Sequence, residues 1–125
     1  MRALVVDDSS TIRSILRMTL RSAGFEVVEA GNGVEALLRL EQTGKVDVVL
    51  VDWNMPEMNG YEFLCAARSN AAYDGTKIVM VTTESELEQV KAALEHGANE
   101  YIMKPFTRDA VIEKIQLMEL LPQCV

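Results

Sequence analysis

Five short apolar segments recur along the chain, and a segment with helical spacing follows each of them. The apolar segments are rich in Val, Ile and Leu and do not alternate with polar residues. That pattern is typical of strands buried on both faces of a parallel sheet. We predict strands at residues 3–6, 25–28, 46–51, 78–81 and 101–103, and helices at residues 10–23, 33–43, 60–69, 85–96 and 108–120.

Residues typical of helix caps mark several of these boundaries. Glycine just after a helical segment predicts a C-terminal cap, and Asn or Ser three residues before Glu predicts a helix start. The glycines are Gly24, Gly44 and Gly97, and the capping pairs are Asn59 with Glu62 and Ser85 with Glu88. The longest connection, residues 69–77, contains turn-forming residues and predicts a surface loop.

Strand–helix alternation repeated five times predicts an α/β fold. We expect a (βα)5 doubly wound, five-stranded parallel sheet covered by helices on both faces, with right-handed crossovers. The length of 125 residues fits one domain, so residues 1–125 are expected to form a single unit. Sheets of this kind bind ligands beyond the carboxyl ends of their strands.

Polar residues stand at the carboxyl ends of four of the five predicted strands, and we expect them to share one edge of the sheet. The second strand runs into Glu29, which offers no evident site chemistry. The residues at the other four ends are Asp7 and Asp8, then Asp52, then Thr82 and Thr83, and finally Lys104.

Three carboxylates in one place repel one another, at about 4 kcal/mol for a pair at ~4 Å and an effective dielectric constant of 20. Either one of them stays protonated or a cation binds. Oxygen ligands without nearby His or Cys favour Mg²⁺ over Ca²⁺, zinc or copper. With a metal bound, Asp52 could attack phosphorus, while Lys104 and Thr82 contact the transferred group. The alternative is that Lys104 merely neutralises an acidic patch.

Four short motifs follow one another along the chain: Val5-Val6-Asp7-Asp8, Val51-Asp52-x-Asn54-Met55-Pro56-x-Met58-x-Gly60, Val81-Thr82 and Lys104-Pro105. Together they resemble the receiver domain of two-component response regulators, over about residues 2–120. The resemblance implies the flavodoxin-like strand order 2-1-3-4-5 in a three-layer α/β/α arrangement, with the first strand beside the third. The stretch from Asp52 to Pro56, with Tyr101 three residues before Lys104, resembles the single-domain, CheY-like members in particular.

The resemblance implies a role for each matching residue. Asp52 is expected to accept a phosphoryl group from a sensor histidine kinase, and a cis peptide bond is implied at Lys104-Pro105. The implied Mg²⁺ ligands are Asp8, Asp52 and the backbone carbonyl of Asn54, with Asp7 acting through water. Lys104 is implied to pair with the phosphoryl group and Thr82 to hydrogen-bond it, whereupon Tyr101 swings inward; Asn54 and Glu84 are implied to tune the phosphate lifetime.

We therefore predict a phosphorylation-activated switch, not an enzyme, with self-catalysed phosphoryl transfer and slow autodephosphorylation. The first choice of function is a chemotaxis regulator that acts on a flagellar motor through a face made by residues 85–97, 101–103 and 108–120. A phosphate sink, a phosphorelay shuttle or an adaptor for another signalling enzyme is the alternative. The residues do not identify the kinase, the target or a phosphatase.

Other classes fit the sequence less well. A phosphatase or mutase with an aspartate nucleophile typically needs a second carboxylate two residues later, where this chain has Asn54. A flavodoxin-type carrier needs a phosphate-binding first loop, but Asp7 and Asp8 would repel phosphate. The net charge of −7 argues against binding nucleic acid. With no apolar stretch of about 20 residues and no leader before the first strand, we expect a cytoplasmic, monomeric protein without membrane insertion.

Overall fold

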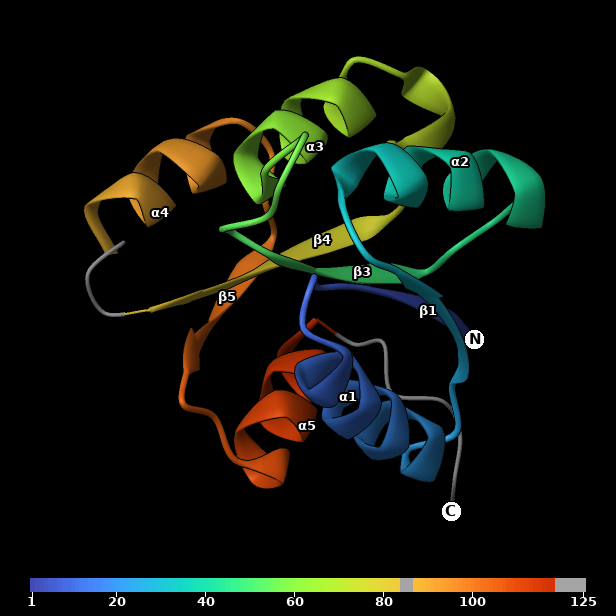
Figure 1. Ribbon diagram of the computed structural model, residues 1–125, viewed down its shortest axis with the longest axis vertical. Helices are drawn as coiled ribbons and strands as arrows, with labels where there is room; N and C mark the ends of the chain where they lie inside the picture. Colours follow the sequence, from blue (N-terminus) through green and yellow to red (C-terminus); the bar gives the residue numbers. More distant parts are fainter. Residues whose placement is uncertain (84–86, 119–125) are drawn as a thin grey trace.

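The computed structural model describes residues 1–83 and 87–118, and its strands and helices alternate along the chain (Figure 1). The strands are β1 (Arg2–Val6), β2 (Glu26–Ala30), β3 (Val48–Asp52), β4 (Lys77–Thr83) and β5 (Glu100–Lys104). The helices are α1 (Ser10–Ser22), α2 (Gly33–Thr43), α3 (Gly60–Arg68), α4 (Leu87–Glu95) and α5 (Arg108–Leu117), with a short 3₁₀ helix at Ala71–Tyr73.

The five strands form one parallel sheet in the order β2-β1-β3-β4-β5. The predicted fold class and strand order are therefore confirmed. The chain leaves β1 toward β2 and then returns to place β3 on the other side of β1. This reversal places the carboxyl ends of β1 and β3 side by side, where ligands bind in sheets of this type.

Helices cover both faces of the sheet, with α1 and α5 on one side and α2, α3 and α4 on the other (Figure 1). Each face has its own apolar core. On the first face Leu16 and Ile115 are buried against the strands, and on the second Leu40 and Phe63 are. Every residue of β3 is buried, as expected of a central parallel strand with helices on both faces.

Some predicted boundaries were wrong by a few residues. β2 begins one residue later than predicted and continues to Ala30, because backbone pairing with β1 keeps the polar end of the segment extended. β3 begins at Val48 and not at residue 46. The connection at residues 69–77 is not a plain loop, because Asn70 caps the 3₁₀ helix and β4 begins at Lys77.

The predicted helix caps that lie within the described residues are confirmed. Asn59 and Glu62 form the reciprocal capping box at the start of α3. Gly24, Gly44 and Gly97 all have positive φ angles. The predicted pair of Ser85 with Glu88 involves a residue outside those described. Within the described ranges, no helix combines the length and the apolarity needed to cross a membrane.

Candidate phosphoryl-acceptor and metal site

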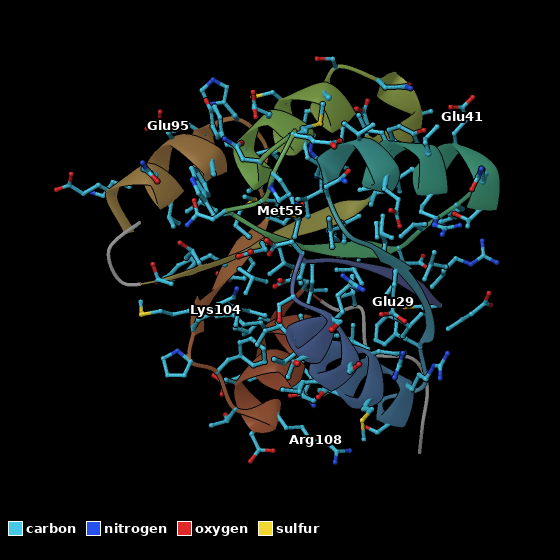
Figure 2. The ribbon with its side chains drawn as sticks, viewed as in Figure 1. Glu29, Glu41, Met55, Glu95, Lys104 and Arg108 are labelled. Atoms are coloured by element: carbon cyan, nitrogen blue, oxygen red, sulfur yellow. The ribbon has the colours of Figure 1, made fainter. Side chains whose placement is uncertain are left out.

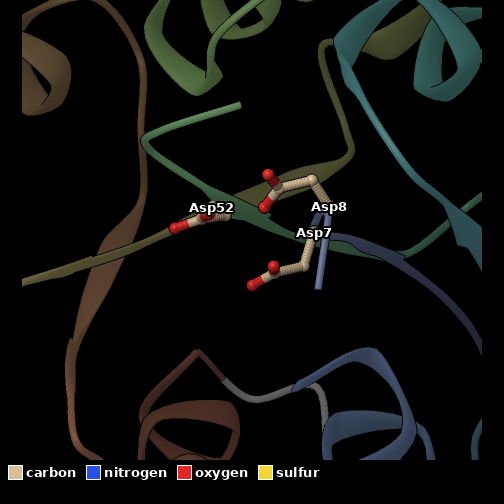
Figure 3. Close-up of side chains that lie close together, drawn as sticks. All are labelled: Asp7, Asp8 and Asp52. Carbon is tan, nitrogen blue, oxygen red and sulfur yellow. The ribbon is translucent and has the colours of Figure 1, made fainter. Parts of the chain in front are cut away.

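Three carboxylates meet where β1 and β3 end. Val6 pairs with Val51 in the sheet, so Asp7 and Asp8 leave β1 beside Asp52 at the end of β3. One oxygen from each carboxylate lies within 4.8 Å of the others. Figure 3 shows the three side chains gathered at this edge. The structure therefore brings together the acidic residues that the sequence placed at separate strand ends.

The three carboxylates differ in how they are held. Asp7 is 1% exposed, and its Oδ1 accepts a hydrogen bond of 2.8 Å from the backbone N–H of Ser9. Asp52 is 7% exposed, whereas Asp8 is exposed to solvent. The site is thus a buried pair of acids, Asp7 and Asp52, with the third acid exposed to a ligand from solution.

Lys104 brings a cation to the same place from the end of β5 (Figure 2). Its Nζ donates to Oδ1 of Asp52 at 2.9 Å and to Oδ2 of Asp7 at 3.3 Å. The peptide bond between Lys104 and Pro105 is cis, as the resemblance implied. In the part of the chain that the structure describes, one ammonium group therefore pairs with two of the three crowded carboxylates.

The electrostatics of the site are unfavourable for an ionised Asp52. Burial is the largest cause, and together with the charges of Asp7 and Asp8 it raises the pKa of Asp52 to about 6, against the opposing effect of Lys104. Burial alone would lower the pKa of Lys104, but the hydrogen bond to Asp52 and the charges of Asp52 and Asp7 outweigh it and raise that pKa. The ammonium is therefore charged at neutral pH, and its single charge leaves the acidic excess only partly balanced.

The donor set fits Mg²⁺. All three side chains offer hard carboxylate oxygens, converge within 4.8 Å and leave Asp8 open to solvent, so bound water can complete a coordination shell. A divalent cation would also relieve the repulsion that raises the pKa of Asp52. The residues present therefore suit the metal that the chemistry of the site predicts.

The loop after β3 packs tightly against the end of that strand. A Cβ atom on Gly60 would lie 2.4 Å from the carbonyl oxygen of Asp52, so only glycine fits at the start of α3. The backbone N–H of Gly60 donates to the carbonyl of Trp53 at 2.9 Å. Asn54 is exposed within this loop, two residues beyond Asp52. The loop thus fixes the backbone around Asp52 while leaving Asn54 accessible.

Thr82 and Tyr101 lie on neighbouring strands but at different depths. Thr82 is completely buried in β4 and stands opposite Met103 of β5. Tyr101 is half-buried on β5, at the edge of the sheet, and packs against the core that lies under α2, α3 and α4. Tyr101 is therefore outside the carboxylate cluster. Glu84, the other predicted lifetime-tuning residue, lies outside the described residues.

Sequence reasoning missed Glu29. Its carboxylate accepts from Arg17 at 3.0 Å and from Arg13 at 3.4 Å, and it stands beside α1 in Figure 2. Arg13 also donates to the backbone carbonyl of Asp7 at 2.6 Å. Glu29 is thus linked to the acidic site through Arg13. The four-residue spacing of the two arginines, with an acid at the end of β2, was the available signal.

Comparison with known proteins agrees with this geometry. A family model described as the response regulator receiver domain matches residues 3–116. The chain is 44% identical over 119 residues to the chemotaxis protein CheY1 of Helicobacter pylori, covering 94% of this chain and 96% of that protein. It is 47% identical over 117 residues to a chemotaxis protein CheY homolog of Campylobacter jejuni, covering 93% and 90%. The crystallised CheY4 of Vibrio cholerae superposes with a TM-score of 0.86 at 39% identity, covering 93% and 96%.

The chain belongs to the response regulator receiver domain family. It is a signalling protein of the two-component type, a response regulator activated by phosphorylation. The similar proteins from Helicobacter and Campylobacter are both named as chemotaxis proteins and match nearly the whole chain.

Proposed function

We propose that Asp52 is the phosphoryl acceptor and that Asp7, Asp8, Asp52 and the backbone carbonyl of Asn54 hold Mg²⁺, Asp7 largely through water. The convergence of the three carboxylates with Lys104 is the observation that carries this proposal. An oxygen of Asp52 attacks phosphorus, the bond from phosphorus to the histidine nitrogen of the donor breaks, and that nitrogen keeps the electron pair. Mg²⁺, when bound, supplies positive charge for the carboxylates and the phosphoryl oxygens.

Lys104 and Thr82 have distinct parts in this proposal. The Lys104 ammonium releases Asp52 and pairs with the transferred group, as a preorganised charge next to the reacting oxygen. Thr82 turns its hydroxyl toward the phosphoryl group, and Tyr101 moves into the space that it leaves. Asn54 and Glu84 set the lifetime of the acyl phosphate. Slow hydrolysis then returns the protein to its starting state without a separate enzymatic activity.

The phosphodonor is proposed to be a histidine kinase. A hollow opens beside Lys104, and it offers a protein donor apolar contact next to the acceptor; its lining comprises Ile12, Ile15, Thr83, Lys104, Pro105 and Phe106. Ile15 is 46% exposed there. The net charge of −7 disfavours nucleic acid as a partner. We further propose that the protein works in the cytoplasm as a monomeric single domain.

The target is proposed to be a flagellar motor component, bound through residues 85–97, 101–103 and 108–120. The names of the similar chemotaxis proteins support the choice of pathway. Pull-downs with and without acetyl phosphate test it, because a motor component should be recovered chiefly with the phosphorylated protein. Equal recovery in both samples, or recovery of a signalling enzyme instead, would favour the adaptor alternative.

Phosphorylation itself is tested by intact mass. The protein is incubated with Mg²⁺ and acetyl phosphate, and the mass is expected to rise by one phosphoryl group. Asp52→Asn is expected to show no gain, and Trp53, buried and directly after Asp52, is expected to report metal binding through its emission. A phosphoryl group retained by Asp52→Asn would place the acceptor elsewhere.

A further inference from the structure

Tyr101 does not lie free at the edge of the sheet. The Nζ of Lys114, from α5, stands over its ring at 4.7 Å from the ring centroid. A cation over the face of an aromatic ring is attracted by the ring's negative electrostatic potential there. Since this contact needs the ring to face Lys114, it favours the ring position seen in this structure, which we call the outer position.

Lys114 is itself anchored. Its Nζ donates to Oε1 of Glu100 at 3.0 Å, and the same oxygen accepts the backbone N–H of Tyr101 at 3.0 Å. The side chains of Lys114 and Glu100 are 30% and 24% exposed, so water screens the pair only in part. The same oxygen of Glu100 thus links the Lys114 ammonium group to the backbone of Tyr101, the residue whose ring Lys114 covers.

Lys114 cannot simply follow the ring if it moves. Val111 and Ile115, on either side of it in α5, are completely buried in the core shared with α1. The ring of Tyr101 packs instead against the core on the opposite face of the sheet. Lys114 therefore reaches around the edge strand β5 from a helix that the core holds in place, and its ammonium group is tied to Glu100. An inward movement of the ring would carry it away from that ammonium group.

We propose that Lys114, anchored by Glu100, is a positioning residue that holds Tyr101 in the outer position and so sets how readily the protein adopts its phosphorylated arrangement. This inference rests on the proposed switching role of Tyr101. By linkage, a contact made only in the outer position must be lost on switching, so it weakens binding of any phosphoryl group that requires the inner position. A partner that takes the Lys114 charge for itself would release Tyr101 at the same time.

The test uses the full chain labelled with 3-fluorotyrosine. The chain has three tyrosines, and Tyr101→Phe identifies the ¹⁹F signal of Tyr101. With Mg²⁺ alone, Lys114→Gln is expected to move this signal from the wild-type position toward the one that the wild type takes with beryllofluoride. The half-saturating beryllofluoride concentration, followed by Trp53 emission, is expected to fall about two- to fivefold, the effect of one cation–π contact at a half-exposed site.

Three variants make the comparison specific. Lys114→Arg keeps a cation and is expected to retain the wild-type signal. Glu100→Gln removes the anchoring charge and is expected to change both readouts in the direction of Lys114→Gln, by less. Lys45→Gln, at an exposed position just after α2 and outside the proposed target face, removes the same charge and is expected to change neither readout. Equal changes in Lys45→Gln and Lys114→Gln would overturn the proposal, because general charge would then explain them.

The two proposals fail in different ways. If beryllofluoride shifts the Tyr101 signal of the wild type but Lys114→Gln leaves both signal and affinity unchanged, the positioning role is overturned and the switch stands. If beryllofluoride binds, as Trp53 emission reports, without moving the Tyr101 signal, the switching role is overturned and this inference with it. If beryllofluoride does not bind at all, the proposed acceptor site is itself wrong.

Discussion

The two ends of the sheet handle charge in opposite ways. At the amino end, Arg68 donates to the carbonyls of Tyr73 and Thr76 at 2.8 Å each, to the carbonyl of Gly97 at 2.9 Å and to the side chain of Asn99 at 2.9 Å. Asp47 likewise accepts the backbone N–H of Arg2 at 2.8 Å. Partly buried polar groups that make several hydrogen bonds within the protein add to stability. This end therefore ties together the starts of the strands and the loops that enter them.

The carboxyl end leaves its charges in excess. Asp7, Asp8 and Asp52 face one ammonium group among the described residues, and the pKa of Asp52 rises to about 6 as a result of burial and repulsion. The proposed function uses the end of the sheet where charge is unbalanced. At the amino end, side chains with several hydrogen-bond partners stabilise the protein, whereas at the carboxyl end a proton, a metal, or a phosphoryl group with its metal would balance the carboxylates.

The largest effect is expected from breaking the amino end. Arg68→Ala should lower the free energy of unfolding by about 2–4 kcal/mol, because three backbone carbonyls lose a charged donor at once. Urea denaturation measures this loss. Arg21→Ala, at an exposed position of α1, is the control and should stay within about 0.5 kcal/mol of the wild type. Equal losses in the two variants would show that Arg68 is not the anchor that its contacts indicate.

At the carboxyl end, removing a charged side chain should raise the free energy of unfolding instead of lowering it. Asp52→Asn should raise the free energy of unfolding by about 1–3 kcal/mol at pH 7 without Mg²⁺, because it removes a carboxylate whose ionised form is disfavoured. Urea denaturation in the presence of a chelator measures the gain. Asp47→Asn makes the same chemical change at the amino end and should destabilise the protein by about 1 kcal/mol. If both variants destabilise, the contrast between the two ends is lost.

The pH dependence of folding stability should follow from the raised pKa of Asp52. The pKa of Asp52 rises from 3.8 to about 6 on folding, so between these values the folded state holds more protons than the unfolded state. The stability that protonated Asp52 contributes is complete below pH 3.8 and is lost as the pH rises through about 6. Without metal, wild-type stability relative to Asp52→Asn should therefore fall by about 2 kcal/mol from pH 4 to pH 7. A constant difference across this range would contradict the shift.

Binding of Mg²⁺ should recover the stability that the repulsion among the three carboxylates takes away. At ten times its dissociation constant, Mg²⁺ should raise the free energy of unfolding of the wild type by about 1.4 kcal/mol. Asp52→Asn should gain less at the same concentration, since it has lost one of three converging carboxylates. Thermal unfolding with Mg²⁺, and with the same ionic strength of Na⁺ as control, measures the difference. Equal gains from the two salts would indicate screening and not binding.

The location of the charged residues at the carboxyl end of the sheet could be predicted from the sequence, for a physical reason. Apolar strands and their order fix where Asp7, Asp8, Asp52 and Lys104 stand, because strand ends in a parallel sheet share one edge. What could not be predicted depends on side-chain reach. Nothing in the local pattern says that Arg68 spans from α3 to carbonyls that precede β4 and β5.

The ring contact of Tyr101 was beyond prediction for the same reason. It depends on Lys114, which lies 13 residues further along the chain on the far side of the sheet edge. Helical spacing placed residue 114 on a helix, and the apolar pattern placed residue 101 in a strand. Neither pattern states that a long side chain of α5 reaches around the edge strand to a ring that packs on the opposite face of the sheet.

Glu29 tests why charged residues at the two ends of the sheet differ in their effect on stability. The cause is either the end at which a residue lies or whether it has partners of opposite charge. It lies toward the carboxyl end of β2, yet it has two arginine partners and therefore resembles the amino end in its interactions. If pairing governs, Glu29→Gln should lower the free energy of unfolding by about 0.5–1 kcal/mol, unlike Asp52→Asn, which should raise it. Glu35→Gln, in an exposed pair with Arg39 at 3.8 Å, is the control and should cost about 0.3 kcal/mol. A gain in stability for Glu29→Gln would mean that every acid at this end is destabilising, and that incomplete pairing at Asp52 is not the cause.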